Sequence, residues 1–272
     1  MQLATFQAVI EAGSFDAAAR AMHVSPSAVS QRIKALEQDV GQVLVRRAKP
    51  CEPTEAGRAL VRFAGQVGLL EREALAAARG GLAGSRVRVS VVVNADSLHT
   101  WFMPALARLP HLVFDLHQDD QEYTADLLRA GTVMAAVTSQ HVAVQGCRVE
   151  RLGAMRYLAV AAPSLDFQGF ATTPVILLNR KDELQHRFMG PGVDPPVHYV
   201  PAAASFVDAV RLGLGWALVP EQIARADSRL VELTPGKHLD VPLYWQRWRI
   251  ESDVLTDLTA AVKEVAATAL RS

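Results

Sequence analysis

The spacing of apolar and polar residues changes once along the chain, near residue 86. Before that point apolar side chains recur every three or four residues, which is the spacing of amphipathic helices. After it, short apolar runs such as 87–93 and 134–138 alternate with helical segments. That alternation is typical of a parallel sheet with helices on its faces. The pattern therefore predicts a helical N-terminal part followed by an α/β part.

The most informative stretch of the N-terminal part is a pair of short helices joined by a tight turn at 23–24. Ser14 is placed to cap the first helix and Ser25 the second, and Pro26 occupies the first helical position, where a missing N–H has no partner to lose. The second helix has one apolar side and one hydrogen-bonding side. The apolar side consists of Val29, Ile33, Leu36 and Val40, and the other of Ser27, Ser30, Gln31, Lys34 and Gln38, with Arg32 at its flank.

This division suits a recognition helix in a DNA major groove, which packs on one face and offers donors to phosphates and base edges on the other. The alternative is an ordinary solvated amphipathic helix, but such a helix usually mixes Glu and Lys on its exposed face. A cationic segment at 46–49 follows, between two short strands predicted within 44–51. Arg47 and Lys49 are placed there to meet phosphates beside the groove, as a wing does.

A long helix is predicted next, capped by Thr54 and running to about residue 79. Its apolar residues alternate spacings of three and four, which is the seam of a short coiled coil. The seam consists of Leu60, Phe63, Val67, Leu70, Ala74 and Ala77. One interpretation is a dimer that sets the spacing of two DNA-binding heads; the other is a helix packed on its own body. The segment 79–85, RGGLAGS, is a hinge by composition.

The remaining pattern predicts two α/β lobes. Strands are expected at 87–93, 112–117, 134–138, 156–162, 175–178, 198–200, 216–219 and 243–250, and helices at 97–108, 122–130, 182–188, 205–212 and 253–270. Because the pattern restarts after 156–162, we expect two lobes linked by two crossing strands, with a ligand cleft near the C-terminal ends of the strands. Only a dozen residues separate the strands at 156–162 and 175–178, so either the second lobe is trimmed or residues are absent there.

Polar side chains follow the first three strands of the α/β part. Asn94 and Ser97 come after the first strand, where the N–H groups of a helix start can bind a carboxylate. Asp119 and Asp120 follow the second strand and could hold an ammonium or guanidinium group, and Thr138 ends the third. Each feature also has a plainer interpretation, namely a helix cap, a solvated acidic loop and a turn.

Charge is unevenly distributed, although the net charge of the 272 residues is zero. Residues 1–86 carry 11 Lys and Arg against 8 Asp and Glu, which favours a basic DNA-binding head on a body with another role. No apolar run approaches the roughly 20 residues of a membrane span, and the N-terminus lacks the features of a signal peptide. Cys51 and Cys147 have no metal-ligand spacing, and reduced thiols in a cytoplasmic protein are expected.

Two other classes of protein are less consistent with these patterns. For an enzyme, the eight histidines are scattered without the spacing of a nucleophile or metal site, and no glycine-rich phosphate loop follows a strand. A solute-binding protein would have no use for the basic head and wing. We therefore expect no catalytic activity, cofactor, metal or membrane contact.

A set of residue types at fixed spacing extends over the first 57 positions. The set consists of Leu3, Phe6, Val9, Gly13, Ser14, Phe15, Ala18, Ala19, Ser27, Ala28, Val29, Ser30, Ile33, Leu36, Glu37, Gly41, Leu44, Arg46, Thr54, Ala56 and Gly57. With this set the chain resembles the LysR-type transcriptional regulators. In that family the start of the second helix and the wing contact DNA. By position, this implies contacts from Pro26, Ser27, Ser30, Gln31 and Lys49, with Arg32, Lys34 and Arg47 beside them.

The resemblance implies an α/β fold with an all-α winged helix-turn-helix N-terminal domain, a linker helix and a two-lobed effector domain like the periplasmic binding proteins. The implied boundaries are 1–57 for the DNA-binding domain, 58–86 for the linker or dimerisation helix and hinge, and 87–272 for the effector-binding domain. Lobe I spans about 87–160 and 243–272, and lobe II about 161–242. The family also implies a dimer within a tetramer on double-stranded promoter DNA, with RNA polymerase as a further candidate partner.

Further motifs narrow the resemblance to one branch of the family. NADSLxTW at 94–101, LTPG at 233–236 and LYWxR at 243–247 look like the LysG/ArgP branch, whose members sense basic amino acids and activate an amino-acid exporter gene. The resemblance implies lysine or arginine as the effector; the alternative is a regulator of another operon with a different effector. Relatives have hydroxyls and a carboxylate before the helix of Phe206, where this chain has three alanines and only Ser205 is left. The candidate effector contacts are Asn94, Ser97, Asp119, Asp120, Thr138 and Ser205.

Overall fold

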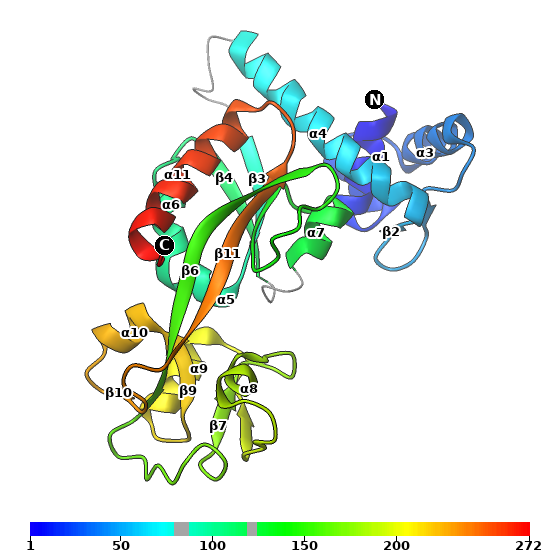
Figure 1. The fold of residues 1–272 in the computed structure, drawn as a ribbon. Helices are drawn as coiled ribbons and strands as arrows, with labels where there is room; N and C mark the ends of the chain where they lie inside the picture. The colour runs from blue at the N-terminus through cyan, green and yellow to red at the C-terminus, as the bar shows by residue number, and fades with distance from the viewer. Residues whose placement is uncertain (79–86, 119–123) are drawn as a thin grey trace.

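A computed structural model of the chain describes residues 1–78, 87–118 and 124–272 (Figure 1). It consists of a small helical head, one long helix and a two-lobed α/β body, which confirms the predicted fold class. The predicted hinge at 79–85 and the acidic residues Asp119 and Asp120 lie outside the described residues. Within the described part, no helix is both long enough and apolar enough to cross a membrane.

Local capping explains the helices of the head. They are α1 (Gln2–Ala12), α2 (Phe15–Ala21) and α3 (Pro26–Val40). Ser14 Oγ accepts the N–H of Ala17 at 3.1 Å and Ser25 Oγ accepts that of Ala28 at 3.2 Å, so both predicted N-caps are confirmed. The turn between α2 and α3 contains His23 at a positive φ of 53°. The helices share one buried core, which includes Phe6, Val9, Ala18, Val29, Ile33 and Leu36.

A short antiparallel pair of strands forms the predicted wing. The strands are β1 (Val45–Arg46) and β2 (Glu52–Pro53). The second strand lies later than the sequence predicts, because residues 47–51 form the loop between the strands. Glu37, near the end of α3, accepts the N–H groups of Leu44 and Val45 at 2.8 and 3.3 Å. These bonds fix the wing to the end of α3.

The long helix α4 (Glu55–Ala78) begins at the predicted cap, where Thr54 Oγ1 accepts the N–H of Gly57 at 3.1 Å. The predicted seam is largely open to solvent, since Phe63, Val67 and Leu70 are 48%, 39% and 39% exposed. A different side of α4 is buried within the same chain and carries Val61, Ala64, Gly65, Leu69 and Ala76. The helix thus packs on its own body through one face and leaves the predicted seam uncovered in the single chain.

Three contacts of α4 with the body are specific, and the first is a hydrogen bond from the guanidinium of Arg62 to the carbonyl of Gln145. A side chain at Gly65 would lie only 2.7 Å from the ring of Trp248, so the ring sits directly against the backbone of the helix. Further along, Glu73 Oε1 accepts the hydroxyl of Ser252 at 2.6 Å and the N–H of Val254 at 3.0 Å. This close packing explains a glycine in the middle of a helix, where it would otherwise reduce stability by about 1 kcal/mol relative to alanine.

Among the described residues, the body is organised around a seven-stranded sheet with the order β10-β6-β11-β5-β3-β4, and β9 also pairs with β6. The strands are β3 (Val87–Val93), β4 (Leu112–Gln118), β5 (Ala135–Thr138), β6 (Cys147–Ala161), β9 (Ala217–Pro220), β10 (Val231–Glu232) and β11 (His238–Trp248). β3 pairs in parallel with β4 and β5. Figure 1 shows β6 and β11 running together between the two lobes, as predicted, and they pair in antiparallel.

Helices cover the sheet in lobe I. They are α5 (Ala95–Ser97), the π-helical turn η1 (Leu98–Phe102), α6 (Met103–Ala107), α7 (Thr124–Ala130) and α11 (Asp253–Ala269). The helix predicted at 97–108 thus begins earlier, at Ala95, and changes its hydrogen-bonding pattern in the middle. α11 begins where predicted, with Ser252 Oγ accepting the N–H of Leu255 at 3.2 Å.

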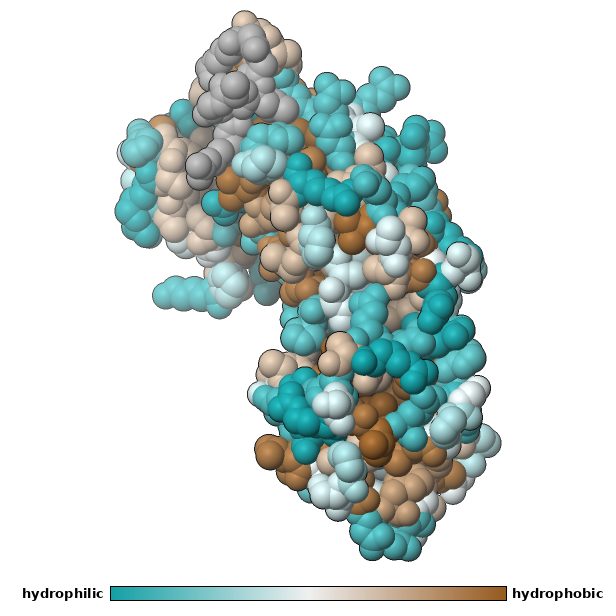
Figure 2. Space-filling model, turned by 90° about the vertical axis from the view of Figure 1, so that its left-hand side faces the viewer, coloured by the Kyte–Doolittle hydropathy of each residue, from teal (hydrophilic) through white to brown (hydrophobic). Residues whose placement is uncertain are grey.

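Lobe II is small. Its own elements are β7 (Val175–Leu177), α8 (Leu184–Met189), β8 (Val197–Tyr199), α9 (Ala203–Arg211) and α10 (Glu221–Ala226). The short segment 162–174 forms turns, and Phe170 within it packs against Phe188 and Trp216 with ring centroids 5.7 and 4.6 Å apart. An aromatic cluster therefore packs this short segment against the rest of the lobe. Figure 2 shows apolar side chains on the surface of this lobe, where Leu212 and Leu214 are exposed.

The crossing strands are longer than the sequence predicts. β6 begins at Cys147 instead of 156, and β11 begins at His238 instead of 243. The added residues are mostly polar on one side, which hides their strand character in a search for apolar runs. Their pairing register shifts between Leu243 and Tyr244, opposite Gly153. The elements α10 and β10 have no counterpart in the prediction.

Candidate functional site

The outer face of α3 carries the hydrogen-bonding side chains predicted to contact DNA. Pro26, Ser27, Gln31 and Lys34 are exposed, and Ser30 and Arg32 are half-buried. The opposite face packs into the head, where Val29 and Ile33 are buried. Because the apolar face is fully occupied, the polar face is free to meet a groove without changing the packing of α3.

The wing adds positive charge beside this face. Arg47 and Lys49 are exposed in its loop. The guanidinium of Arg47 lies over the ring of Phe15 in α2, 4.7 Å from its centroid, and such a cation–π contact holds the charge close to the helices. Arg46 forms an ion pair with Glu52 across the wing at 3.5 Å. The head therefore presents a polar helix flanked by a positioned cation.

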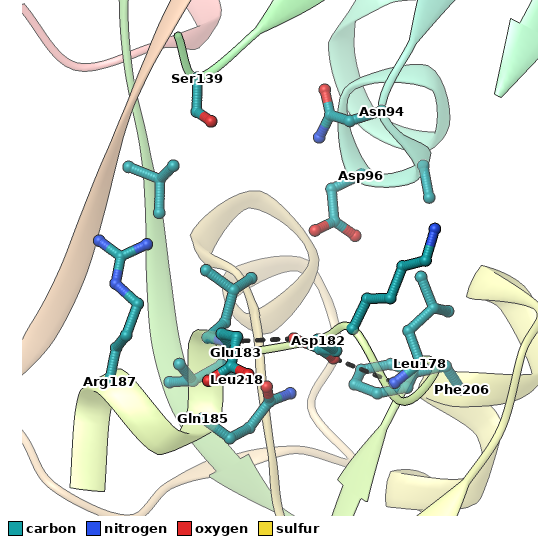
Figure 3. Close-up of a pocket in the computed structure, with 14 residues that line it drawn as sticks. Asn94, Asp96, Ser139, Leu178, Asp182, Glu183, Gln185, Arg187, Phe206 and Leu218 are labelled. Carbon is teal, nitrogen blue, oxygen red and sulfur yellow. Dashed lines mark hydrogen bonds between the residues drawn. The ribbon is translucent and has the colours of Figure 1, made fainter. Parts of the chain in front are cut away.

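A second candidate site is a cleft between the lobes. Lobe I contributes residues that follow β3 and β5, and lobe II contributes the loop after β7 together with α8 and α9 (Figure 3). The cleft encloses about 780 Å³, including its open mouth. Its lining includes Asn94, Asp96 and Ser139 from lobe I, and Leu178, Lys181, Asp182, Glu183, Gln185, Arg187 and Phe206 from lobe II. Carboxylates and cations both line it, which suits a ligand that carries both signs of charge.

Two carboxylates of the cleft are held in place by hydrogen bonds. Asp96 Oδ2 accepts the hydroxyl of Tyr157 at 2.7 Å. Asp182 accepts the N–H of Leu178 at 3.0 Å and the N–H of Leu184 at 3.2 Å, which fixes the loop between β7 and α8. The acidic part of the cleft is therefore positioned by the fold before any ligand binds.

Two buried amide oxygens line the cleft from opposite walls. Asn94 is 3% exposed and Gln185 is 1% exposed. Neither Asn94 Oδ1 nor Gln185 Oε1 has a hydrogen-bond partner among the described residues, whereas Gln185 Nε2 donates to the carbonyl of Ile176 at 3.2 Å. Buried acceptors without partners are unfavourable, so both oxygens would gain from a ligand that supplies N–H groups.

The structure places the predicted effector residues at different depths. Asn94 lines the cleft, whereas Ser97 is fully buried and does not line it. Thr138 is buried, with Oγ1 accepting the N–H of Gln140 at 3.1 Å, and its neighbour Ser139 lines the cleft instead. Ser205 is exposed within α9, whose N-cap is Ala202 without a side-chain bond, so Ser205 does not cap that helix.

The sequence interpretation missed most of the lobe II wall. Asp182, Gln185 and Arg187 follow β7 within the stretch NRKDELQHR, and none of them is among the predicted contacts. β7 has only three residues, so its signal is weak. The rule that ligands bind beyond the C-terminal ends of strands would have found them if it had been applied to this strand too.

Asp227 and Cys147, two ionisable groups outside the cleft, have shifted pKa values. Hydrogen bonds from Arg229 and Arg211 hold the pKa of Asp227 well below its usual range. Burial raises the pKa of the Cys147 thiol, against an opposing effect of nearby Arg62. No group of three His, Cys, Asp or Glu side chains within the described ranges is arranged to hold a metal ion.

A head with a helix-turn-helix and a wing, joined to a body with a ligand cleft, defines the class of ligand-responsive transcriptional regulators. Residues 1–58 match the family of bacterial regulatory helix-turn-helix proteins of the lysR family, and residues 80–267 match the LysR substrate binding domain. The chain therefore belongs to the LysR family and is a DNA-binding transcriptional regulator.

Close relatives define the branch of the family. The chain is 43% identical over 288 residues to the lysine export transcriptional regulatory protein LysG of Corynebacterium glutamicum, covering 100% of this chain and 99% of the relative. It matches the crystal structure of ArgP from Mycobacterium tuberculosis with a TM-score of 0.89 and 44% identity, covering 100% of this chain and 98% of that one. It matches full-length LysG from C. glutamicum with bound effector Arg with a TM-score of 0.82 and 43% identity, covering 100% and 99%. These similarities confirm the predicted LysG/ArgP branch.

Proposed function

We propose that this protein binds a basic amino acid, arginine or lysine, between its two lobes and in response activates transcription of an amino-acid exporter gene. The observation that carries the proposal is the cleft lined by Asp96, Asp182 and Glu183, together with the amide oxygens of Asn94 and Gln185, which have no hydrogen-bond partner within the described part of the chain. Carboxylates and amide oxygens are the groups that accept hydrogen bonds from a guanidinium or ammonium group. The relatives named for lysine export and solved with bound Arg support the same ligand class.

The DNA contacts proposed for this function come from α3 and the wing. They are Pro26, Ser27, Ser30, Gln31, Arg32 and Lys34 on the helix, and Arg47 and Lys49 on the wing. Exposure of the polar face of α3 and the placement of Arg47 over Phe15 support this assignment. Contacts to phosphates would position the head, and the uncharged side chains at the start of α3 would read base edges.

We also propose that the protein acts as a dimer, within a tetramer, through the exposed seam of α4. Leu60, Phe63, Val67 and Leu70 form an apolar stripe, and three of the four are at least 39% exposed in the single chain. Such a stripe is typical of a surface covered by a second helix. In this arrangement 1–57 bind DNA, 58–86 pair the chains and 87–272 bind the effector. A cytoplasmic location and contact with RNA polymerase belong to the same proposal.

Thermal unfolding of the full chain against the twenty amino acids tests the ligand. A ligand that binds only the folded state adds about 2.7 kcal/mol at 100 times its Kd, which raises the melting midpoint measurably. We expect a rise with arginine and lysine and none with glutamate, leucine or serine. If no basic amino acid at millimolar concentration raises the midpoint, the proposed effector is wrong. The assignment of the head to DNA binding would not be affected.

A further inference from the structure

The wall formed by lobe I is poorly suited to a carboxylate. Asp96 lies in the first turn of α5, lines the cleft and holds its position through the hydroxyl of Tyr157. A ligand carboxylate beside it would meet a like charge, which is destabilising. The hydroxyl of Ser97, the predicted seat for that carboxylate, is buried outside the cleft. Both cations that line the cleft, Lys181 and Arg187, belong to lobe II, so the acidic end of an amino acid is better matched by that wall, although Asp182 and Glu183 also lie there.

The lobe II wall carries two cationic side chains, those of Lys181 and Arg187. Arg187 lies on α8, and Figure 3 shows its guanidinium extending from the helix along the cleft on the side of Ser139, while Asp96 and Asn94 lie on the other side. The guanidinium of Arg187 forms no hydrogen bond or ion pair with any described residue, and only the backbone N–H of this residue is bonded, to the carbonyl of Glu183 at 2.9 Å. Glu183, the N-cap residue of α8, stands four residues earlier, at a spacing that favours pairing, yet the two side chains do not form an ion pair.

We propose that Arg187 binds the α-carboxylate of the effector and thereby distinguishes amino acids from the corresponding decarboxylated amines. This inference rests on the proposed function of the cleft. A guanidinium donates two parallel N–H bonds to a carboxylate, which Lys181, the other cation lining the cleft, cannot do. The cationic side chain of the effector lies toward Asp96, so its two ends contact different lobes and a bound amino acid bridges the cleft.

The test compares arginine with agmatine, which has the same guanidinium but no carboxylate. Calorimetry on the full chain measures both affinities for the wild type, R187M and R187K. We expect R187M to weaken arginine binding by a factor on the order of ten or more, the size expected for lost hydrogen bonds to a charged group, and to leave agmatine binding unchanged. R187K keeps the positive charge but cannot donate two parallel N–H bonds, so it should retain part of the preference for arginine over agmatine.

Two further variants decide between explanations. R225M removes another exposed positive charge of lobe II, from α10 and outside the cleft, and should leave the ratio of arginine to agmatine affinity as in the wild type. If K181M abolishes the preference for arginine and R187M does not, Lys181 binds the carboxylate and the inference is wrong. Equal weakening of both ligands by R187M also overturns it, while arginine binding by the wild type leaves the proposed function intact. If the wild type binds neither arginine nor lysine, the proposed function itself fails.

Discussion

The contact between Glu73 and the start of α11 allows a quantitative test of how the linker helix is attached to the body. Glu73 Oε1 accepts one hydrogen bond from the hydroxyl of Ser252 and one from the N–H of Val254, at 2.6 and 3.0 Å. Ser252 is buried at 5% exposure. E73A would leave both donors without a partner, whereas E73Q keeps an acceptor and removes only its charge.

The expected loss follows from the two bonds. A hydrogen bond to a charged group contributes about 1.5 to 3 kcal/mol, and water reaching the half-buried Glu73 site recovers part of it in the variant. An anion near a helix N-terminus adds about 0.3 to 1 kcal/mol. We therefore expect E73A to lower the free energy of unfolding by about 2 to 3 kcal/mol and E73Q by about 1 kcal/mol. Alanine favours the helix, so the loss cannot come from helix propensity.

Urea unfolding followed by tryptophan fluorescence measures this loss, because Trp248 touches the same helix at Gly65. E71A is the matched control: Glu71 is exposed on the same helix, and its removal should change stability by less than about 0.5 kcal/mol. A double-mutant cycle of E73A with S252A should give a coupling energy of about 1 kcal/mol. If the two changes are additive, or if E73A behaves like E71A, the contact does not hold the helix to the body.

Three further predictions concern other parts of the chain. Two hydrogen bonds from Arg156, both at 2.8 Å, hold the pKa of Asp240 below its ordinary value. The stabilisation of the folded state by these bonds is therefore fully present above the unfolded pKa of about 3.9, and it is lost as pH falls through the folded pKa. The stability difference between the wild type and D240N should be constant from about pH 5 to 8 and shrink below about pH 4, measured by urea unfolding; an unchanged difference at pH 3 would contradict this. K34Q should reduce the salt dependence of DNA binding by about one counterion for each head, measured by titration between low and high salt; an unchanged slope would remove Lys34 from the phosphate contacts. Cys51 should react with a thiol reagent before Cys147, a buried residue whose thiol has a raised pKa, and faster labelling of Cys147 would show that the body opens locally.

The head was the part most fully predictable from the sequence, because its signals are local. Ser14, Ser25 and Thr54 each cap a helix within three residues of their own position, so the sequence contains both partners of each bond side by side. The apolar face of α3 likewise follows from spacing alone. Such features need no knowledge of the rest of the fold.

The effector cleft was less predictable because its walls depend on distant pairings. The start of β6 is a strand because it pairs with the end of β11, about a hundred residues later, and its own residues read as polar. Ser97 follows β3 as expected, but the early start of the helix at Ala95 buries its hydroxyl and turns Asp96 into the cleft. No local pattern distinguishes these two outcomes.

The attachment of α4 also has a mechanical consequence. The helix is held to lobe I at Arg62, Gly65 and Glu73, while its first residues lie at the DNA-binding head. From Glu73 to Glu55 the axis extends about 27 Å at ~1.5 Å per residue. A rotation of lobe I and the attached helix by about 7° about an axis through Glu73 would therefore carry the head by about 3.3 Å, close to the rise of one base pair along DNA. With this geometry the linker helix would act as a lever, turning a small rotation of lobe I into a displacement of the head comparable to the spacing of base pairs.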